Sequence, residues 1–354
     1  MKHLKKLALV LAVVMLFSLL TACGKTSAPA ESTPTDSGET TYKPVVWKVS
    51  HNAADGQATA AGFVQFADLI KERTDGRITI ELYGNNVLGS DTETREMLME
   101  GTIDILAIGA GYMGVYNGAC NLINMPYNFA NREELLHMYD SEWGQKYIAE
   151  PFLSEYNVRL IDYWPNSDRQ FISTKPVRSA EDLDGVKLRI PSGYNTHESV
   201  WSDLGAMTVT MAIGDAVTGM QQNVIDAVEM PIDYLFNYGF HEIAKYLSLT
   251  RHSIYAQCVF IREDSLNAVS PEDQKIVLDT IKECGLYATD VLDASEAEVI
   301  KKMEDAGVEI IDFTAEQRQV FLDVAKATFE EYMDDWGREC YDAFTAELEA
   351  FRAG

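Results

Sequence analysis

The residue with the clearest potential chemistry is Arg189, in the segment 186–191 (VKLRIP). The alternation of this segment predicts a short strand that sends its apolar residues to one face and Lys187 and Arg189 to the other. A guanidinium on the non-core face matches the shape of a carboxylate and can bind it through two parallel charge-assisted hydrogen bonds. The pattern alone leaves a second interpretation open, in which Arg189 is solvated or held in an internal ion pair.

The other reactive residue types form no recognisable metal-binding or catalytic pattern. The six histidines show no paired metal spacing and have no neighbouring cysteine. Acidic residues are abundant, but none has a recognisable general-acid partner in the sequence. Four widely spaced cysteines fit disulfides or buried free thiols about equally well: Cys120, Cys258, Cys284 and Cys340. We therefore predict no metal, no cofactor and no enzymatic activity.

The elements that must position Arg189 are predicted to form two α/β lobes. The first half alternates strands and helices in the order β-α-β-α-β: a strand at 45–49, a helix with apolar positions at 63–70 that ends at 75–76, a strand at 78–82, a helix at about 92–100 and a strand at 103–108. This order favours a mostly parallel sheet. The second half repeats the alternation, with the strand at 186–191 and a helix near 196–204. Further helices are predicted to begin at Ser270 and Thr314, where a polar cap precedes an apolar period.

The N-terminus has the layout of an export signal. Three lysines within residues 2–6 precede the apolar run 7–20, which is too short to span a bilayer as a stable helix. The following LTAC sequence, ending in Cys23, resembles the bacterial lipobox, in which the cysteine thiol receives a diacylglyceryl group. The alternative is an ordinary signal peptide with an incidental cysteine. We expect cleavage after residue 22, lipidation of Cys23 and a flexible tether at 23–44.

Length and charge restrict the possible functions. Removal of residues 1–22 leaves 354 − 22 = 332 residues, which are more than one simple core holds. The formal net charge of the whole chain is −26. So acidic a surface argues against binding to nucleic acid and against polybasic docking on a membrane.

The segment 109–114 (GAGYMG) fits the G-x-G-x-x-G pattern of dinucleotide-binding loops and follows a predicted strand. Its context does not fit, because Gly118, Asn121 and Pro126 follow it instead of an amphipathic helix and a second strand. An exported protein also meets little NAD. We interpret the glycines as positions where the backbone approaches a ligand closely.

The chain resembles the extracytoplasmic solute receptors of tripartite ATP-independent periplasmic (TRAP) transporters over about residues 45–350. The similar segments follow the family in order and spacing, at 84–89, 100–104 (EGTID), 124–127 (NMPY), 182–191 (DLDGVKLRIP), 204–206 (LGA) and 224–231 (VIDAVEMP). The resemblance implies an α/β fold, a two-lobed periplasmic-binding-protein-like clamshell with crossing strands and a long C-terminal helix.

The resemblance also implies ligand-binding residues. Arg189 matches the arginine that pairs with the substrate carboxylate, and Arg169 matches a second arginine near the ligand. Asn52 matches a polar position that reaches the pocket in some members, and His51 lies beside it. The other candidates are Gly109 and Tyr112 in the loop after the strand 103–108, Ile213 where some members stack an aromatic ring, Glu229, Met230 and Trp164.

Three of these positions depart from the family pattern. Met230 stands where many members have an asparagine after the glutamate. Gly109 carries no acid and Tyr112 is no arginine, which argues against sialic acid as the ligand. Trp164 fits the lining of a pocket and the packing of a core equally well.

Together, these observations predict an extracytoplasmic, lipid-anchored receptor that closes on a small organic acid through an arginine–carboxylate pair. The resemblance implies delivery of the acid to the small and large membrane subunits of a TRAP permease. We predict lobe I at 45–166 and about 255–295, and lobe II at 167–254 and about 296–354. Two other functions stay open, a sensor subunit that presents its ligand to a membrane signalling protein and an extracellular enzyme acting on acidic sugars.

Overall fold

The computed structural model describes residues 42–354. The predicted signal peptide at 1–22, the lipidation at Cys23 and the tether up to residue 41 lie outside the described residues. None of the helices within residues 42–354 is both long enough and apolar enough to cross a membrane.

The first lobe is built on a five-stranded sheet with the strand order β2-β1-β3-β10-β4. Its strands are β1 (Val45–His51), β2 (Ile78–Tyr83), β3 (Ile105–Gly109), β4 (Val158–Pro165) and β10 (Ala256–Arg262). β1 pairs in parallel with β2 and β3, while β10 is antiparallel to β3 and β4. Between β1 and β3 the chain forms α2 (Ala58–Arg73) and α3 (Asp91–Glu100), in the β-α-β-α-β order expected from the sequence.

The second lobe is built on a six-stranded sheet with the order β11-β9-β5-β8-β6-β7. Its strands are β5 (Arg169–Ser173), β6 (Lys187–Ile190), β7 (Met207–Thr210), β8 (Ala227–Pro231), β9 (Tyr246–Ser253) and β11 (Glu309–Asp312). β6 pairs in parallel with β7 and β8, and β5 is antiparallel to β8 and β9. The helices of this part are η2 (Ala180–Leu183), α9 (Asn195–Asp203), α10 (Ile213–Gln221), α11 (Ile232–Asn237) and α12 (Phe240–Ile243).

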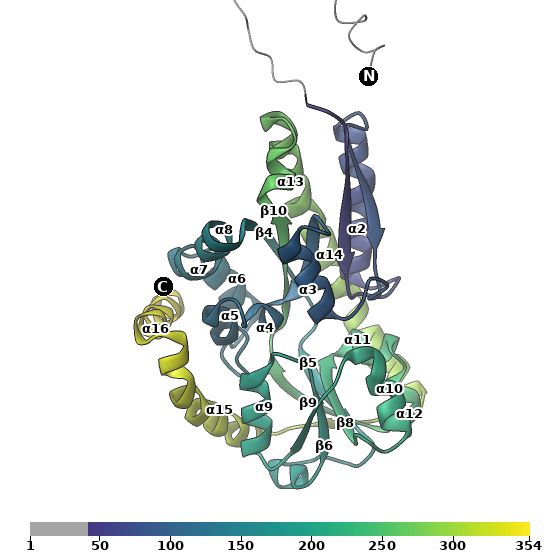
Figure 1. Ribbon diagram of the computed structural model, residues 1–354. Helices are drawn as coiled ribbons and strands as arrows, with labels where there is room; N and C mark the ends of the chain where they lie inside the picture. Colours follow the sequence, from purple (N-terminus) through teal and green to yellow (C-terminus); the bar gives the residue numbers. More distant parts are fainter. Residues whose placement is uncertain (1–41) are drawn as a thin grey trace, which may run out of the picture. The chain divides into compact units, whose positions relative to one another are not determined.

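The chain passes between the two sheets from β4 to β5, from β9 to β10, and along α14 (Pro271–Asp305) (Figure 1). Val277 and Ile281, near the start of α14, pack in the core beside β1 and β10. Val299 and Met303, near its end, pack in the core of the second lobe. The two lobes with their crossing strands confirm the predicted clamshell class.

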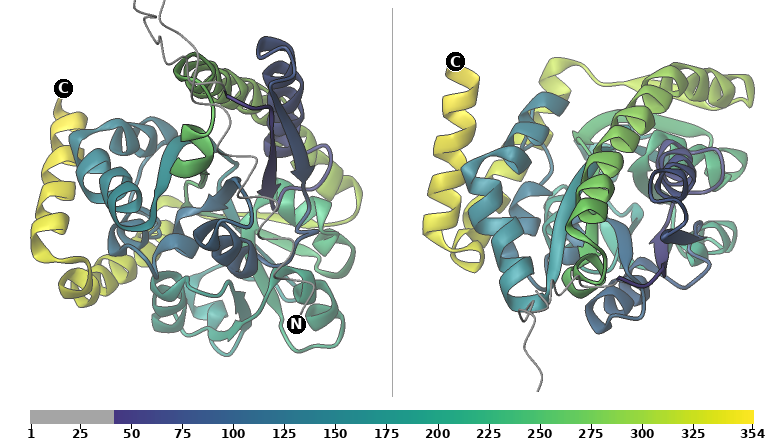
Figure 2. Two further views of the ribbon diagram at one scale, coloured as in Figure 1. Left: turned by 45° about the horizontal axis from the view of Figure 1, so that its top comes forward. Right: turned by 90° about the horizontal axis from the view of Figure 1, so that it is seen from above.

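The remaining helices of the first lobe follow β3 or β10, and two helices form the C-terminus. They are α4 (Ala110–Met113), α5 (Gly118–Ile123), α6 (Arg132–Asp140), α7 (Glu142–Gly144), the π-helix η1 (Gln145–Ala149), α8 (Glu150–Tyr156), α13 (Glu263–Asn267), α15 (Ala315–Trp336) and α16 (Arg338–Ala353). The predicted C-terminal helix is divided at Gly337, whose φ is +83°. α15 and α16 lie on the side of the molecule away from α2 (Figures 1 and 2).

α16 differs from the predicted division into lobes, which assigns all of 296–354 to lobe II. It packs against α6 and α7, because Phe344 and Leu348 are buried there among apolar residues of the first lobe. Trp143 of α7 donates a hydrogen bond of 3.0 Å to the Cys340 carbonyl, and Arg352 pairs with Glu134. The C-terminal segment therefore contacts both lobes, and the other boundaries remain our proposal.

Local sequence signals explain where the long helices begin. Ser90 and Glu93 form a reciprocal capping box at the start of α3, and the helix ends at Gly101 in the left-handed conformation. The hydroxyl of Ser270 accepts a hydrogen bond from the backbone of Asp273 at the start of α14. Thr314 and Gln317 form a second capping box, on α15. The starts at Ser270 and Thr314 agree with the sequence prediction, whereas α3 begins one residue before the predicted position 92.

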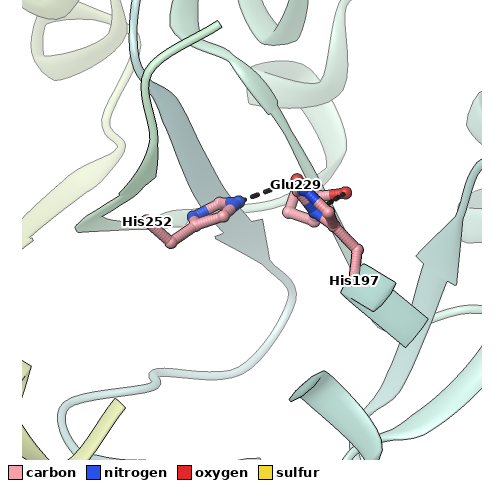
Figure 3. A group of neighbouring side chains, drawn as sticks. All are labelled: His197, Glu229 and His252. Atoms are coloured by element: carbon pink, nitrogen blue, oxygen red, sulfur yellow. Dashed lines mark hydrogen bonds and ion pairs between the residues drawn. The ribbon is translucent and has the colours of Figure 1, made fainter. Parts of the chain in front are cut away.

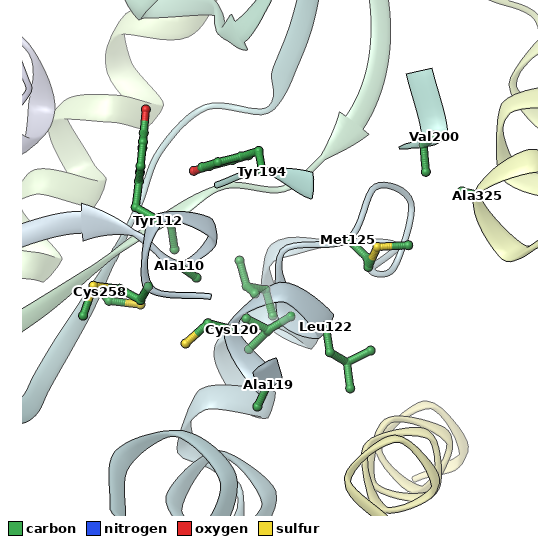
Figure 4. Close-up of a cluster of buried hydrophobic side chains, with 14 of the residues drawn as sticks. Ala110, Tyr112, Ala119, Cys120, Leu122, Met125, Tyr194, Val200, Cys258 and Ala325 are labelled. Atoms are coloured by element: carbon green, nitrogen blue, oxygen red, sulfur yellow. The ribbon is translucent and has the colours of Figure 1, made fainter. Parts of the chain in front are cut away.

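The four cysteines within the described residues are free and buried. Cys120 and Cys258 belong to a large apolar cluster, in which Tyr112 and Tyr194 also lie (Figure 4). Burial raises the pKa of both thiols. Of the two alternatives that the spacing leaves open, the structure therefore has buried thiols.

Candidate functional site

A cavity lies between the two lobes, where β6, β8 and the starts of several helices meet the end of β1. The cavity has a volume of about 350 Å³ when its opening to solvent is included. The centre of a water molecule can occupy only about 20 Å³ of it. Six of the ten binding residues predicted from the sequence line it: Asn52, Tyr112, Arg169, Arg189, Ile213 and Met230. The ligand-binding roles of these residues remain predictions.

Arg189 lies on β6 between β7 and β8, with Leu188 and Ile190 buried on either side of it. The strand sends Arg189 away from the core, as the alternation predicts, but the side chain is only 1% exposed. Its Nε donates a hydrogen bond of 2.8 Å to the Met211 carbonyl, which fixes the plane of the guanidinium. Its two Nη groups donate no hydrogen bond to any of residues 42–354, so they remain available to a ligand in the cavity.

Arg169 also lines the cavity, but its positive charge is paired with the buried carboxylate of Glu229. It lies diagonally across the β5–β8 pair from Glu229, in reach for a cross-strand contact. Arg169 Nε and Nη2 donate to the two carboxylate oxygens of Glu229 at 2.6 and 2.7 Å. The centroids of the Tyr194 and Tyr255 rings each lie 5.4 Å from Cζ of the guanidinium.

Glu229 is completely buried and does not line the cavity, and its predicted contact with the ligand stays a prediction. His252 Nε2 contacts its Oε2 at 2.9 Å, and His197 Nδ1 lies 3.9 Å from its Oε1 (Figure 3). The positive charge of Arg169 and the hydrogen bond from His252 hold the pKa of Glu229 well below its usual value, against the opposing effect of burial. The two histidines and Glu229 could surround a cation, but both carboxylate oxygens already bind Arg169. We therefore assign the cluster to positioning Arg169.

Three further predicted residues also lie outside the lining. His51 stacks on Phe63, with ring centroids 5.4 Å apart, because alternation along β1 places it on the same face as Trp47 and Val49. Trp164 packs 4.4 Å from Phe63 and donates to Asp162, so its core interpretation is the one the structure supports. A side chain at Gly109 would have its Cβ 2.6 Å from the Tyr194 hydroxyl. Gly109 thus makes room for aromatic side chains that line the cavity.

Seven lining residues were not predicted from the sequence: Asp91, Pro191, Tyr194, Pro231, Tyr234, Tyr238 and Tyr255. Asp91 is the first residue of α3 and accepts a hydrogen bond of 2.8 Å from the Asn52 amide. Burial raises its pKa, while Asn52 and the positive charge of Arg189 oppose that effect. The sequence predicts a helix start at residue 92, one position after Asp91, so Asp91 does not stand out as a site residue. These four tyrosines come from three segments of the chain, with Tyr234 and Tyr238 both at α11, and carry no shared sequence signal.

Several hydrogen bonds join the two lobes around the cavity. Gln57 at the start of α2 donates to Asp233 at the start of α11, at 2.9 Å. The Tyr234 hydroxyl donates to the Asn52 side-chain oxygen at 3.0 Å. His197 Nε2 contacts the Asn124 carbonyl at 2.8 Å. The lobes are therefore closed on each other in this structure.

The buried histidines predict a loss of stability on mild acidification. Burial lowers the pKa of His51 to about 4 and that of His197 to about 3, from an ordinary value of 6.5. The unfolded chain takes up protons near pH 6.5 and the folded chain does not, so stability falls as the pH drops from 6.5 toward these lower values. We expect urea titrations to give a free energy of unfolding about 1 kcal/mol lower per histidine at pH 5.5 than at pH 7.

The variant His51→Phe tests the origin of this pH dependence. The phenyl ring preserves the stack on Phe63 and removes one group that titrates. We expect the variant to lose less stability than the wild type between pH 7 and pH 5.5. Identical profiles for the two proteins would contradict the assignment to His51.

The two lobes, the crossing strands and the enclosed arginine define the class of two-lobed solute-binding proteins. The chain belongs to the family described as bacterial extracellular solute-binding protein, family 7, whose model matches residues 49–335. This match confirms the resemblance to TRAP solute receptors that the sequence segments indicate.

Relatives and solved structures of this family are similar over most of the chain. The sialic acid-binding periplasmic protein of Vibrio cholerae is 26% identical over 82% of this chain and 89% of that protein. The C4-dicarboxylate-binding protein of Bacillus subtilis is 25% identical over 83% of this chain and 84% of that protein. A TRAP periplasmic solute-binding protein of Desulfovibrio salexigens, solved with bound orotic acid, has a TM-score of 0.81 and 22% identity, covering 86% of this chain and 99% of that chain.

Proposed function

We propose that this protein binds a small organic acid through its carboxylate at Arg189 and hands it, chemically unchanged, to the small and large membrane subunits of a TRAP permease. The observation that carries the proposal is the state of Arg189. The guanidinium is buried, fixed at Nε, and has both Nη groups directed to no partner within residues 42–354. Taking a charge out of water is costly unless it is paired, so a bound carboxylate would stabilise the closed state.

Closure couples to binding because the site takes groups from both lobes. Arg189 comes from β6 of the second lobe, and Asn52 follows β1 of the first. A ligand that touches both makes its full set of contacts only in the closed state, and so shifts the equilibrium toward closure. About 20 Å³ of open space admits about one water molecule, so we infer that the lobes must separate for the acid to enter.

The membrane anchor belongs to the same proposal. A diacylglyceryl group on Cys23 and the tether at 23–44 would keep the receptor near its permease. Replacement of Cys23 by alanine would then release the protein from the membrane fraction while leaving ligand binding intact.

A thermal-shift screen tests the function. Mono- and dicarboxylates, keto acids, uronates and sialic acid are each added to the purified mature protein. An acid present at 100 times its Kd should raise the free energy of unfolding by about 2.7 kcal/mol. Long incubation should return that acid intact, since the receptor forms no product. A screen in which no carboxylate shifts the melting temperature, or in which the acid is converted, contradicts the proposal.

A further inference from the structure

Two opposite charges remain unpaired with each other in the cavity. Arg189 belongs to the second lobe and Asp91 to the first, and both line the cavity. No ion pair within the described residues joins them, whereas Arg169 is neutralised by Glu229. The ligand therefore meets one cation on one lobe and one carboxylate on the other, neither of which forms an ion pair within residues 42–354. Besides Asn52, the Tyr112 hydroxyl hydrogen-bonds the Asp91 carboxylate.

The Asp91 carboxylate is held in place as firmly as Arg189. Asp91 is only 5% exposed, and Asn52 Nδ2 donates a hydrogen bond of 2.8 Å to its Oδ1. The Asn52 oxygen in turn accepts from Tyr234 and from Gln257, at 3.0 and 2.6 Å. Because Asn52 is fixed from both lobes, Asp91 faces the cavity as an oriented acceptor rather than as a mobile surface acid.

Tyrosine side chains restrict the size of the ligand. The Tyr194 ring lies against Gly109 and Gly111, where a Cβ would come within 2.6 and 2.7 Å of its atoms. The ring centroid of Tyr255 is as close to the Arg169 guanidinium as that of Tyr194, and its hydroxyl also lies against Gly109. These rings fill space beside the loop after β3, and the whole cavity measures about 350 Å³ with its opening to solvent included.

We infer that the ligand is a compact monocarboxylate that also carries a hydrogen-bond donor, a hydroxyl or an ammonium group, which binds Asp91 while the carboxylate binds Arg189. This inference rests on the proposed function, because it takes the carboxylate at Arg189 as given. A hydroxyl or ammonium group at the other end of the ligand donates a hydrogen bond to Asp91, so that the ligand contacts both lobes. A dicarboxylate would place its second negative charge against Asp91, and like charges in a desolvated site repel strongly.

Two matched series of acids test the inference by calorimetry on the mature protein. The four-carbon series is 4-hydroxybutyrate, 4-aminobutyrate, succinate and butyrate, and the three-carbon series is 3-hydroxypropionate, β-alanine, malonate and propionate. Within the series whose length fits, we expect a donor-bearing acid to bind at least about 10-fold more tightly than the alkyl acid and about 30-fold more tightly than the dicarboxylate. The hydroxyl and ammonium members separate the two kinds of donor.

The outcomes distinguish this inference from the proposed function. If a dicarboxylate binds most tightly and its binding is lost in Arg189→Ala, the role of Asp91 is overturned and the proposed function stands. If D-glucuronate binds and none of the small acids does, the compact size is overturned. If no acid of either series binds and D-glucuronate does not bind either, the inference and the proposed function both fail.

The variant Asp91→Asn supplies a second readout. It keeps the size of the side chain and removes the negative charge, so we expect the preference for a donor-bearing acid over the dicarboxylate to fall at least about 10-fold. Asp305→Asn, at an exposed position at the end of α14 and outside the cavity, is the matched control and should keep the wild-type preference. An unchanged preference in folded Asp91→Asn overturns the inference. Should that variant fail to fold, the wild-type series decides alone.

Discussion

Replacing Arg189 by alanine is expected to weaken binding of the carboxylate ligand at least 30- to 100-fold, which corresponds to about 2–3 kcal/mol. The expected loss is large because the ligand would exchange two charge-assisted hydrogen bonds for a cavity with no compensating cation. Arg169 cannot take over this role, since its charge is already committed to Glu229. Calorimetric titration of the acid found in the thermal-shift screen measures the effect.

Two variants isolate the contribution of the planar Arg189 guanidinium to the binding affinity. Arg189→Lys keeps the charge and loses the planar pair of donors, so most of the affinity should still be lost. Lys187→Ala is the matched control on the same strand, because the Lys187 ammonium group donates to the Asn223 carbonyl outside the cavity. Equal affinity in Arg189→Ala and wild type would remove Arg189 from the site.

The variant Glu229→Gln is expected to lower the free energy of unfolding by about 3–5 kcal/mol at pH 7. The exposed fractions of the Arg169 and Glu229 side chains are 3% and 0%, so water cannot replace the lost carboxylate charge. Arg169 would keep its full charge in the interior with an amide as its partner. Urea denaturation followed by circular dichroism measures the change.

A double variant separates an unpaired buried charge from a simple packing defect. Arg169→Met combined with Glu229→Leu removes both charges, and we expect it to be more stable than Glu229→Gln alone. The exposed pair Lys301–Asp305 provides the contrast, since Asp305→Asn should change stability by less than about 1 kcal/mol. A Glu229→Gln variant as stable as Asp305→Asn would show that the buried pair is not needed for the fold.

Most of the fold could be predicted because its signals are local. The apolar period, the caps at Ser270 and Thr314 and the left-handed Gly101 all act within a few residues. The packing of α16 on the first lobe could not be predicted in the same way. Its apolar face identifies a buried side but does not identify the lobe that covers it.

The part of the site that could be predicted from the residue pattern alone is the arginine on strand β6. Arg189 stands out because alternation on β6 separates it from the core residues beside it. Asp91 and the tyrosines at 194, 234, 238 and 255 could not be found by this reasoning, because they meet only when distant segments converge. The ion pair between Glu229 and Arg169 depends on the register of β5 against β8, which places the two residues diagonally across the strand pair. The sequence alone does not reveal this register. It shows that Glu229 belongs to a family motif, but not which face of the sheet its side chain occupies.

The role of Arg189 is tested most directly by a high-resolution crystal structure of the mature protein with its bound acid. We expect closed lobes and a ligand carboxylate whose two oxygens lie about 3 Å from the two Nη atoms of Arg189. A ligand seated elsewhere, or one whose carboxylate faces solvent while Arg189 binds a protein group, would contradict this role.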